Sequence, residues 1–284
     1  MDISINLYSL YCFIMKIYDC IIFNGENHIL EIRLNELNNF VNHFVIIEFG
    51  ETFTGIRKER SIKNELLKKF EKKIRYFFID TRLSEIDPWK REGYQRNQLT
   101  KGIFDAKPDD IIMISDVDEI PNLKKLDFNN VGNQVFAFSL VHSMYKINLL
   151  RKVFWIGTKL CKKKNFKSPQ WLRSLKVHKK YNFFRIDKFF SKTYYSNFKI
   201  IDNSGWHFGW LMQPDEIIKK VNSYSHTEHN TPLFNNEEYI KKCINNKINF
   251  LDKNDILEIS NDMEKLPNFV KNNLKKFDKW IIKK

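Results

Sequence analysis

The segment DDIIMISDVDEIP, at residues 109–121, places an apolar run directly before a dense acidic turn. The apolar run, 111–115, is typical of a strand buried on both faces of a sheet. Side chains alternate along an extended chain, so Asp116 and Asp118 are expected to point to the same side. Two converging carboxylates repel each other, and a hard divalent cation such as Mn²⁺ or Mg²⁺ relieves that repulsion. With Glu119 as a third carboxylate, the segment favours a metal site at Asp116 and Asp118 over a solvated acidic turn.

The chain before this segment alternates between short apolar runs and helical stretches. The apolar runs predict buried parallel strands at 17–23, 44–49, 74–79 and 111–115. Helices are predicted between them, at 29–40, 62–72 and 89–106. In the first of these helices apolar side chains recur on one face, which leaves Arg33 and Glu36 on the opposite side. This alternation is typical of an α/β protein with an open sheet.

The pattern changes after residue 121. A strand is expected at 135–141, then a basic and aromatic stretch at 145–199, a compact group at 205–210, and helices near 214–223, 237–245 and 267–277. No linker rich in Gly, Pro or Ser divides the chain, so we predict one domain over 17–284 with an elaborated C-terminal half. Residues 1–16 are expected to be an extension, and Met15 is an alternative start.

Composition excludes several classes of protein. The chain has 284 residues, a net charge of +14 and four cysteines without zinc-site spacing, which disfavours disulfide scaffolds and zinc fingers. The charge has two open explanations, binding of a polyanion or an AT-rich coding sequence. The apolar stretch 3–15 is shorter than the ~20 residues of a membrane span and lacks a basic flank. A soluble, cytoplasmic protein is therefore expected, with an anionic membrane as a candidate surface contact.

Polar residues follow each predicted strand at its carboxyl end, where ligands bind in open α/β sheets. They are Asn24 and Glu26 after the first strand, Glu48, Thr52, Thr54 and Gly55 around the end of the second, and the acidic turn after the fourth. Arg96, on the helix before the fourth strand, either reaches a phosphate or a metal-binding carboxylate, or forms a surface pair with Glu92. A metal with basic groups suits a diphosphate ligand. No P-loop or G-x-G-x-x-G motif is present, so transfer of a nucleotide-activated sugar is the leading prediction.

Six collinear blocks carry a family resemblance. They are YDCIIFNGENHILEIRLNEL (18–37), FVIIEFGETFTG (44–55), REGYQRNQLTKGI (91–103), PDDIIMISDVDEIPN (108–122), GWHFGWL (205–211) and EIIKKVNSYSHTEHN (216–230). In these blocks the chain resembles glycosyltransferase family 17, whose characterised activity is that of the bisecting β-1,4-mannosyl-glycoprotein 4-β-N-acetylglucosaminyltransferase.

The resemblance implies a GT-A fold, a Rossmann-like open mixed sheet flanked by helices. It further implies a UDP-N-acetylglucosamine donor, a glycan acceptor, Mn²⁺ dependence and inversion at the anomeric carbon. Residues 17–121 then form the nucleotide-sugar half and 122–284 the acceptor half. The expected donor-binding residues are Asn24, Glu26, Glu48, Thr54, Gly55, Arg96, Asp116 and Trp206.

Inverting transfer requires a base that takes the acceptor proton. Glu119, beside the acidic pair, and Glu228, in the run SHTE at 225–228, are the two candidates. His207, in the GWHF block, is a candidate third metal ligand beside Asp116 and Asp118, or else a core histidine.

The alternative function is nucleic-acid binding, or a metal-dependent nuclease built on Asp116, Asp118 and Glu119. The lysines at 159–167 and 176–180 would then contact phosphates. No recognition-helix or zinc-finger pattern supports this reading, so nucleic acid is the less favoured partner.

Overall fold

The protein is described by a computed structural model that covers residues 15–176 and 197–283. Its first four strands are β1 (Ile17–Phe23), β2 (His43–Phe49), β3 (Ile74–Ile79) and β4 (Ile111–Asp116). They are mutually parallel and adjacent in the order β3-β2-β1-β4. The four parallel strands predicted from the apolar runs are therefore confirmed.

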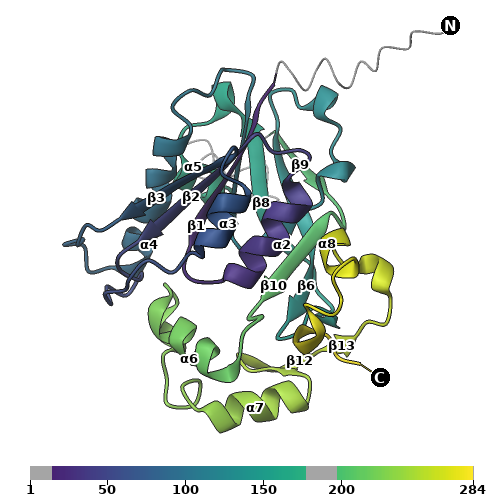
Figure 1. Cartoon of the computed structure of the whole chain (residues 1–284). Helices are drawn as coiled ribbons and strands as arrows, with labels where there is room; N and C mark the ends of the chain where they lie inside the picture. The colour runs from purple at the N-terminus through teal and green to yellow at the C-terminus, as the bar shows by residue number, and fades with distance from the viewer. Residues whose placement is uncertain (1–14, 177–196, 284) are drawn as a thin grey trace, which may run out of the picture.

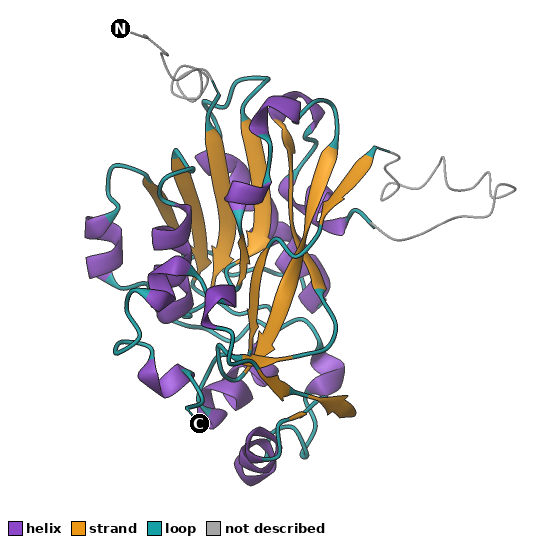
Figure 2. Cartoon of the chain, turned by 90° about the vertical axis from the view of Figure 1, so that its right-hand side faces the viewer, coloured by secondary structure: helices purple, strands orange, loops and turns teal. Residues whose placement is uncertain are grey.

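The sheet becomes mixed beyond β4. β8 (Trp155–Lys162) pairs antiparallel with β4, and β6 (Val135–Met144) pairs antiparallel with β8 (Figure 2). The remaining members of this 11-stranded sheet are β5 (Glu119–Pro121), β7 (Leu149–Leu150), β9 (Phe198–Ile201), β10 (Gly205–Gly209) and β13 (Glu258–Ile259). A separate two-stranded sheet consists of β11 (Ile248–Asn249) and β12 (Asp252–Ile256).

Helices cover both faces of the large sheet (Figure 1). The helices that do so include α2 (Asn27–Leu37), α3 (Asn64–Lys69), α4 (Pro88–Asn97) and α5 (Pro169–Ser174). The other α-helices of the described residues are α6 (Pro214–Ser223), α7 (Glu237–Asn245) and α8 (Asn268–Lys271). The helix predicted at 89–106 ends at Asn97 and continues as the 3₁₀ helix η1 (Gln98–Gly102). There Gly102 packs on the sheet so closely that a Cβ would lie 2.2 Å from Val45 Cγ1.

The helix predicted at 267–277 is also shorter than expected. Its α-helical part ends at Lys271, and the side chain of Asn273 donates to the carbonyl of Phe269. Such side-chain bonds to the backbone compete with the helical hydrogen-bond ladder.

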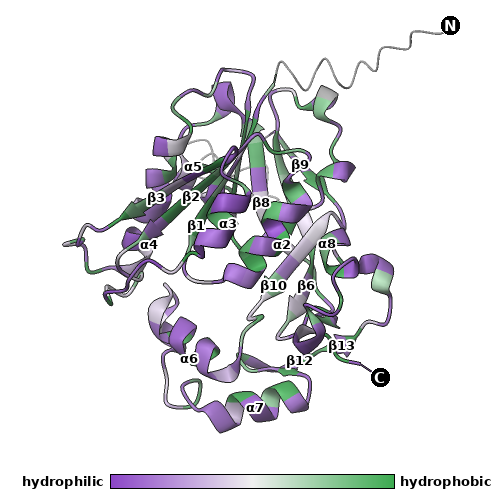
Figure 3. Cartoon of the chain, viewed as in Figure 1, coloured by the Kyte–Doolittle hydropathy of each residue, from purple (hydrophilic) through white to green (hydrophobic). Residues whose placement is uncertain are grey.

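Two apolar cores form on the two faces of the sheet because strand side chains alternate. Ile21 and Phe23 of β1 pack in the core that α2 and α3 cover, whereas Tyr18 and Cys20 pack in the core under η1 and α5. Figure 3 shows β1 and β2 as predominantly hydrophobic segments and the helices as mixed ones. β1, β2 and β4 are thus buried on both faces, as their near-continuous apolar sequences predict, whereas the edge strand β3 is half-buried.

Arg33 corrects one sequence prediction. It was expected opposite the apolar face of its helix, yet it is fully buried on α2. Its guanidinium forms an ion pair with Asp19 at 2.5 Å and donates to the Glu119 carbonyl at 2.6 Å. Buried carbonyls need donors, and Arg33 supplies one at the end of the acidic turn.

A third core lies beyond the carboxyl ends of the strands. It contains Ile217 and Val221 of α6, Ile240 of α7 and Phe250 from the loop after β11. Figure 1 shows α6 and α7 below the lower ends of the strands, so that this part of the chain forms one wall of the space where the parallel strands end. Across the described residues, no helix combines the length and the apolarity needed to cross a lipid bilayer.

Candidate functional site

A pocket of about 610 Å³ opens where β1 and β4 end. The predicted site residues that line it are Asn24, Glu26, Arg96, Asp116, Asp118, Glu119 and His207. Across β1 and β4, Ile22 is level with Asp116, which explains why the chain after β1 lies beside the acidic turn. The residues predicted from the carboxyl ends of the first and fourth strands, together with Arg96 and His207, therefore meet in one pocket.

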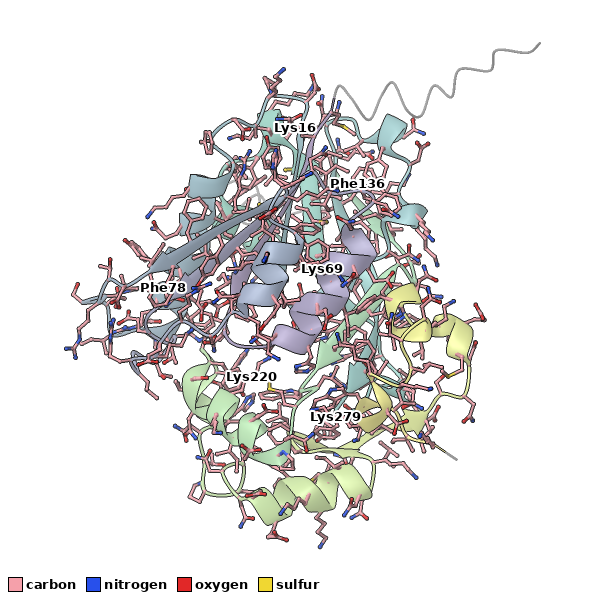
Figure 4. All side chains as sticks on the ribbon, viewed as in Figure 1. Lys16, Lys69, Phe78, Phe136, Lys220 and Lys279 are labelled. Atoms are coloured by element: carbon pink, nitrogen blue, oxygen red, sulfur yellow. The ribbon has the colours of Figure 1, made fainter. Side chains whose placement is uncertain are left out.

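Three short helices each contribute a cation to this pocket. Each begins with a proline at its first position, behind Asp87 in α4, Ser168 in α5 and Gln213 in α6. Their last turns hold Arg96, Arg173 and Lys220, all of which line the pocket. Figure 4 labels Lys220 between α6 and the lower ends of the strands.

Asp116 is held by two of these cations. Its Oδ1 accepts from Arg96 at 3.1 Å and its Oδ2 from Arg173 at 2.5 Å. Burial opposes ionisation, but Arg173 and Arg96 outweigh it and lower the pKa of Asp116 below its ordinary value. Arg96 also pairs with Glu92 at 2.5 Å, and this pair is largely buried rather than on the surface as the sequence interpretation had it.

Glu119 is nearly inaccessible, and its carboxylate is fully engaged. It accepts from Trp155 Nε1 at 2.7 Å, from Arg173 Nη1 at 2.8 Å and from the Asp116 backbone N–H at 3.2 Å. On another side lies Gly157, where a Cβ would come within 2.7 Å of the Glu119 carboxyl carbon. These contacts favour a positioning role for Glu119, because no lone pair faces open space for an incoming proton.

Asp118 lies between Lys220 and His207. Its Oδ2 is 3.3 Å from Lys220 Nζ, and its Oδ1 is 3.7 Å from His207 Nε2. Burial raises the pKa of Asp118 to about 6; Lys220 opposes this rise, and the nearby Asp116 carboxylate adds to it. Lys220 also contacts Glu26 Oε1 at 3.2 Å, so one ammonium serves two carboxylates.

His207 offers a neutral imidazole to the pocket. Burial, the neighbouring His142 and the cationic Lys220 lower the pKa of His207 well below its ordinary value. Its ring stacks on Trp155 with centroids 4.8 Å apart. His207 Nδ1 and Glu26 Oε2 are buried without a hydrogen-bond partner in the described structure.

The charges around the pocket fit a divalent cation. Five carboxylates face three cationic side chains, an excess of two negative charges: Glu26, Glu92, Asp116, Asp118 and Glu119 against Arg96, Arg173 and Lys220. A fourth lining cation, Arg151, is paired with Asp255 at 2.5 Å. Carboxylate oxygens and a neutral imidazole are ligands that Mn²⁺ accepts. Asp118 and His207 can therefore hold a metal. Asp116 could supply a further oxygen ligand, although its carboxylate accepts hydrogen bonds from Arg96 and Arg173 in this structure.

Three predicted donor-binding residues of the second strand and its loop lie outside the pocket lining. Glu48 is buried, and its Oε1 accepts from Lys58 at 2.7 Å and from the Ser61 hydroxyl. Thr54 donates to the Asn222 carbonyl at 2.9 Å, which ties this loop to the end of α6. Gly55 has a φ of +85° and lies against the Arg91 guanidinium. Their contacts are with the protein itself.

Trp206 and Glu228 are not in the lining either. Trp206 packs against the main core, and its Nε1 donates to the Lys265 carbonyl. Glu228 is exposed at the rim, and its Oε1 lies 2.7 Å from His226 Nδ1. Unlike Asp116 and Asp118, Glu228 does not line the pocket, although its neighbours His226 and His229 do.

Sequence reasoning missed Arg173, Lys220 and Trp155. Ser168 with Pro169 is a helix-start signal that could have placed Arg173 in a last helical turn. Lys220 falls in a helix that was predicted, without an assigned role. Trp155 reaches the pocket only because β8 pairs with β4, and the sequence offers no signal for that pairing.

The basic stretch proposed as a nucleic-acid surface is partly used inside the fold. Lys159 is buried, and its Nζ donates to the carbonyls of Arg173 and Leu175 at 2.5 and 2.6 Å. Lys162 and Lys164 both pair with Asp109 at 3.0 Å. Lysines 179 and 180 lie outside the described residues. The predicted phosphate contact of Lys159 is therefore wrong, because its ammonium group is buried and bonded to the protein.

Comparison with known sequences gives a consistent family assignment. A sequence model of glycosyltransferase family 17 matches residues 5–279. Similar relatives are the β-1,4-mannosyl-glycoprotein 4-β-N-acetylglucosaminyltransferases of Rattus norvegicus and Homo sapiens, each 28% identical over 145 residues. Each alignment covers 46% of this chain and 27% of the relative.

Proposed function

Because the chain belongs to glycosyltransferase family 17, we propose that it transfers a sugar from a nucleotide-diphosphate donor to a hydroxyl group of a glycan. The names of its relatives favour N-acetylglucosamine as the sugar, and hence UDP-N-acetylglucosamine as the donor. The proposal includes a GT-A fold, Mn²⁺ or Mg²⁺ as cofactor and inversion at the anomeric carbon.

One observation carries this proposal: an acidic pair and three cations meet in one pocket at the carboxyl ends of the parallel strands. Ligands of open α/β sheets bind at that edge. Arg96, Arg173 and Lys220 offer N–H donors to phosphate oxygens, and guanidinium groups suit bidentate contact with phosphates. A divalent cation would offset the excess negative charge of the carboxylates, and the three cationic side chains would face the oxygens of the diphosphate.

At the anomeric carbon the reaction forms one bond and breaks one, and the acceptor hydroxyl loses its proton to a base. The acceptor oxygen attacks the anomeric carbon, the bond from that carbon to the diphosphate oxygen breaks, and the electron pair leaves with the diphosphate. A divalent cation bound at Asp118 and His207 would stabilise the charge on the leaving diphosphate. Arg173 also contacts Asp116, so it is placed to exchange that carboxylate for a phosphate oxygen.

Glu26 is the carboxylate best placed to accept the proton of the acceptor hydroxyl. It lines the pocket, its Oε1 is held by Lys220, and its Oε2 is buried without a partner. Glu119 is saturated with donors, and Glu228 is an exposed partner of His226. We therefore assign the base to Glu26, in place of the two carboxylates favoured from the sequence.

Turnover of nucleotide sugars tests the function. With Mn²⁺, the protein is expected to hydrolyse UDP-N-acetylglucosamine slowly in the absence of an acceptor, because water can occupy the acceptor position. Released nucleotide is measured across a panel of UDP, GDP and CMP sugars, with and without chelator. Turnover of none of these donors, combined with salt-sensitive binding to DNA, would overturn the proposal in favour of a nucleic-acid function.

The change Glu26→Gln is expected to lower that turnover by about 10²-fold, a loss typical of removing a general base. Its effect should fall on kcat, with the donor KM changed by less than about threefold, because the amide keeps the shape of the side chain. The control is Glu65→Gln, the same chemical change on the exposed side of α3. A Glu26→Gln protein as active as the control would remove Glu26 from this role.

A further inference from the structure

A second set of metal-ligating side chains lies at the rim of the pocket. Among the described residues, His226, Glu228 and His229 form the one group of three whose ligand atoms all lie within 4.8 Å of one another. They lie in and directly before the 3₁₀ helix η6 (Thr227–His229). Side chains three residues apart eclipse in a 3₁₀ helix, which brings the two histidine rings together.

The two imidazole rings are stacked and supported. Their centroids are 5.4 Å apart with an interplanar angle of 14°. The Tyr224 hydroxyl bonds His229 Nδ1, which directs His229 Nε2 away from that contact. Trp89 packs edge-on against His226, with ring centroids 4.6 Å apart. Neighbours that fix the rings of ligating histidines are a regular feature of metal sites.

The carboxylate completes the group. Glu228 Oε1 lies 2.7 Å from His226 Nδ1, and more than half of the Glu228 side chain is exposed. The carboxylate oxygen therefore lies within reach of an ion held by the two imidazoles.

We propose that His226, Glu228 and His229 bind a divalent transition metal of the zinc class, at a site separate from Asp118 and His207. Two imidazole nitrogens and one carboxylate oxygen are a ligand set that Zn²⁺ takes while keeping a fourth position open. Imidazole ligands favour Zn²⁺ over Mg²⁺ and Mn²⁺, so the two sites differ in selectivity.

A metal at this site would affect both the pocket and the contacts between η6 and α4. His226 and His229 line the pocket, so the open position is available to water or to an oxygen of a ligand entering the pocket. Ser225, next to the site, bonds Glu92 of α4, and Trp89 of the same helix touches His226. A bound ion would therefore hold η6 together next to the contacts that join it to α4.

Zinc titration of the chelator-treated full chain tests the proposal. Calorimetry with zinc chloride should show a binding equivalent whose affinity falls by at least about tenfold in Glu228→Gln, and which is lost in the double variant His226→Ala with His229→Ala. Thr227→Ala, in the same turn without a ligand atom in the group, is the control and should bind zinc like the unchanged protein. Cobalt(II) absorption provides a second readout, because histidine ligation alters its spectrum.

A second pair of changes separates this site from the proposed function. The double variant Asp116→Asn with Asp118→Asn should keep the zinc equivalent that the histidine changes remove. Equal zinc affinity in the unchanged protein and in the double histidine variant would overturn the proposal. Loss of the equivalent in the double aspartate variant alone would overturn it too, since the ion would then lie at the acidic turn.

Discussion

Asp118→Asn is expected to lower turnover of the nucleotide-sugar donor by about 10³-fold, because a metal ligand contributes several kcal/mol of stabilisation to the developing charge. Asp118 is the carboxylate nearest the neutral His207, with 3.7 Å between Oδ1 and Nε2. The amide keeps the size of the side chain but removes the charge that attracts a divalent cation. Affinity for Mn²⁺, measured by electron paramagnetic resonance, should fall in parallel with turnover.

The fold should survive this change. Asp118 stands in a cluster with an excess of negative charge, and Lys220 keeps its second partner, Glu26. The melting temperature of Asp118→Asn should therefore be at least that of the unchanged protein. The matched control is Asp109→Asn, at the other end of the same strand region, where an exposed aspartate pairs with Lys162 and Lys164. Full activity in Asp118→Asn would contradict the metal-dependent mechanism.

The parallel half of the fold could be predicted because the apolar sequence of each strand indicates a buried strand. Near-continuous apolar runs such as 111–115 leave little alternative to a central strand. The carboxyl-end rule then located Asp116, Asp118 and Glu26 correctly in one pocket, since the β1–β4 register sets Ile22 beside Asp116. For Glu48 the same rule gave a wrong location. Glu48 lies on β2, level with Phe23 of β1, and Lys58 and Ser61 cover its carboxylate.

The second half of the site depends on pairings that local sequence does not encode. Arg173 and Trp155 reach Glu119 only after β8 has paired antiparallel with β4 and α5 has packed beside it. The basic and aromatic stretch that contains both residues has no hydrophobic period from which this arrangement could be inferred. Long-range pairing, rather than local propensity, therefore decides which of its many charged side chains line the pocket.

Arg33 shows the limit of helical amphipathicity as a guide. A charged residue opposite an apolar face is normally solvated, and the hydrophobic pattern of 29–40 predicts that for Arg33. Its partner is Asp19, a carboxylate inside the apolar strand β1. An acidic residue within a buried strand requires a buried cation as its partner. Asp19 therefore indicated a buried cation, but the amphipathic pattern of the helix gave the opposite prediction for Arg33.

Arg33→Met is expected to lower the free energy of unfolding by about 3–5 kcal/mol, because it leaves the Asp19 charge buried without its partner. Both side chains are fully buried, and the guanidinium also donates to the Glu119 carbonyl and the Ser115 hydroxyl. Urea denaturation followed by circular dichroism measures the change. The matched control is Arg57→Met, which removes the exposed ion pair with Asp80 and should cost less than about 1 kcal/mol.

The double variant Arg33→Met with Asp19→Leu distinguishes a lost ion pair from lost packing. Replacing both charges with apolar side chains removes the uncompensated carboxylate, so the double variant should recover a large part of the stability that Arg33→Met loses. It should still lose donor turnover, because the carbonyls of Asp116 and Glu119 no longer have Arg33 as a donor and the acidic turn is less firmly held. A loss of stability in Arg33→Met no larger than in Arg57→Met would show that this buried pair does not hold the turn.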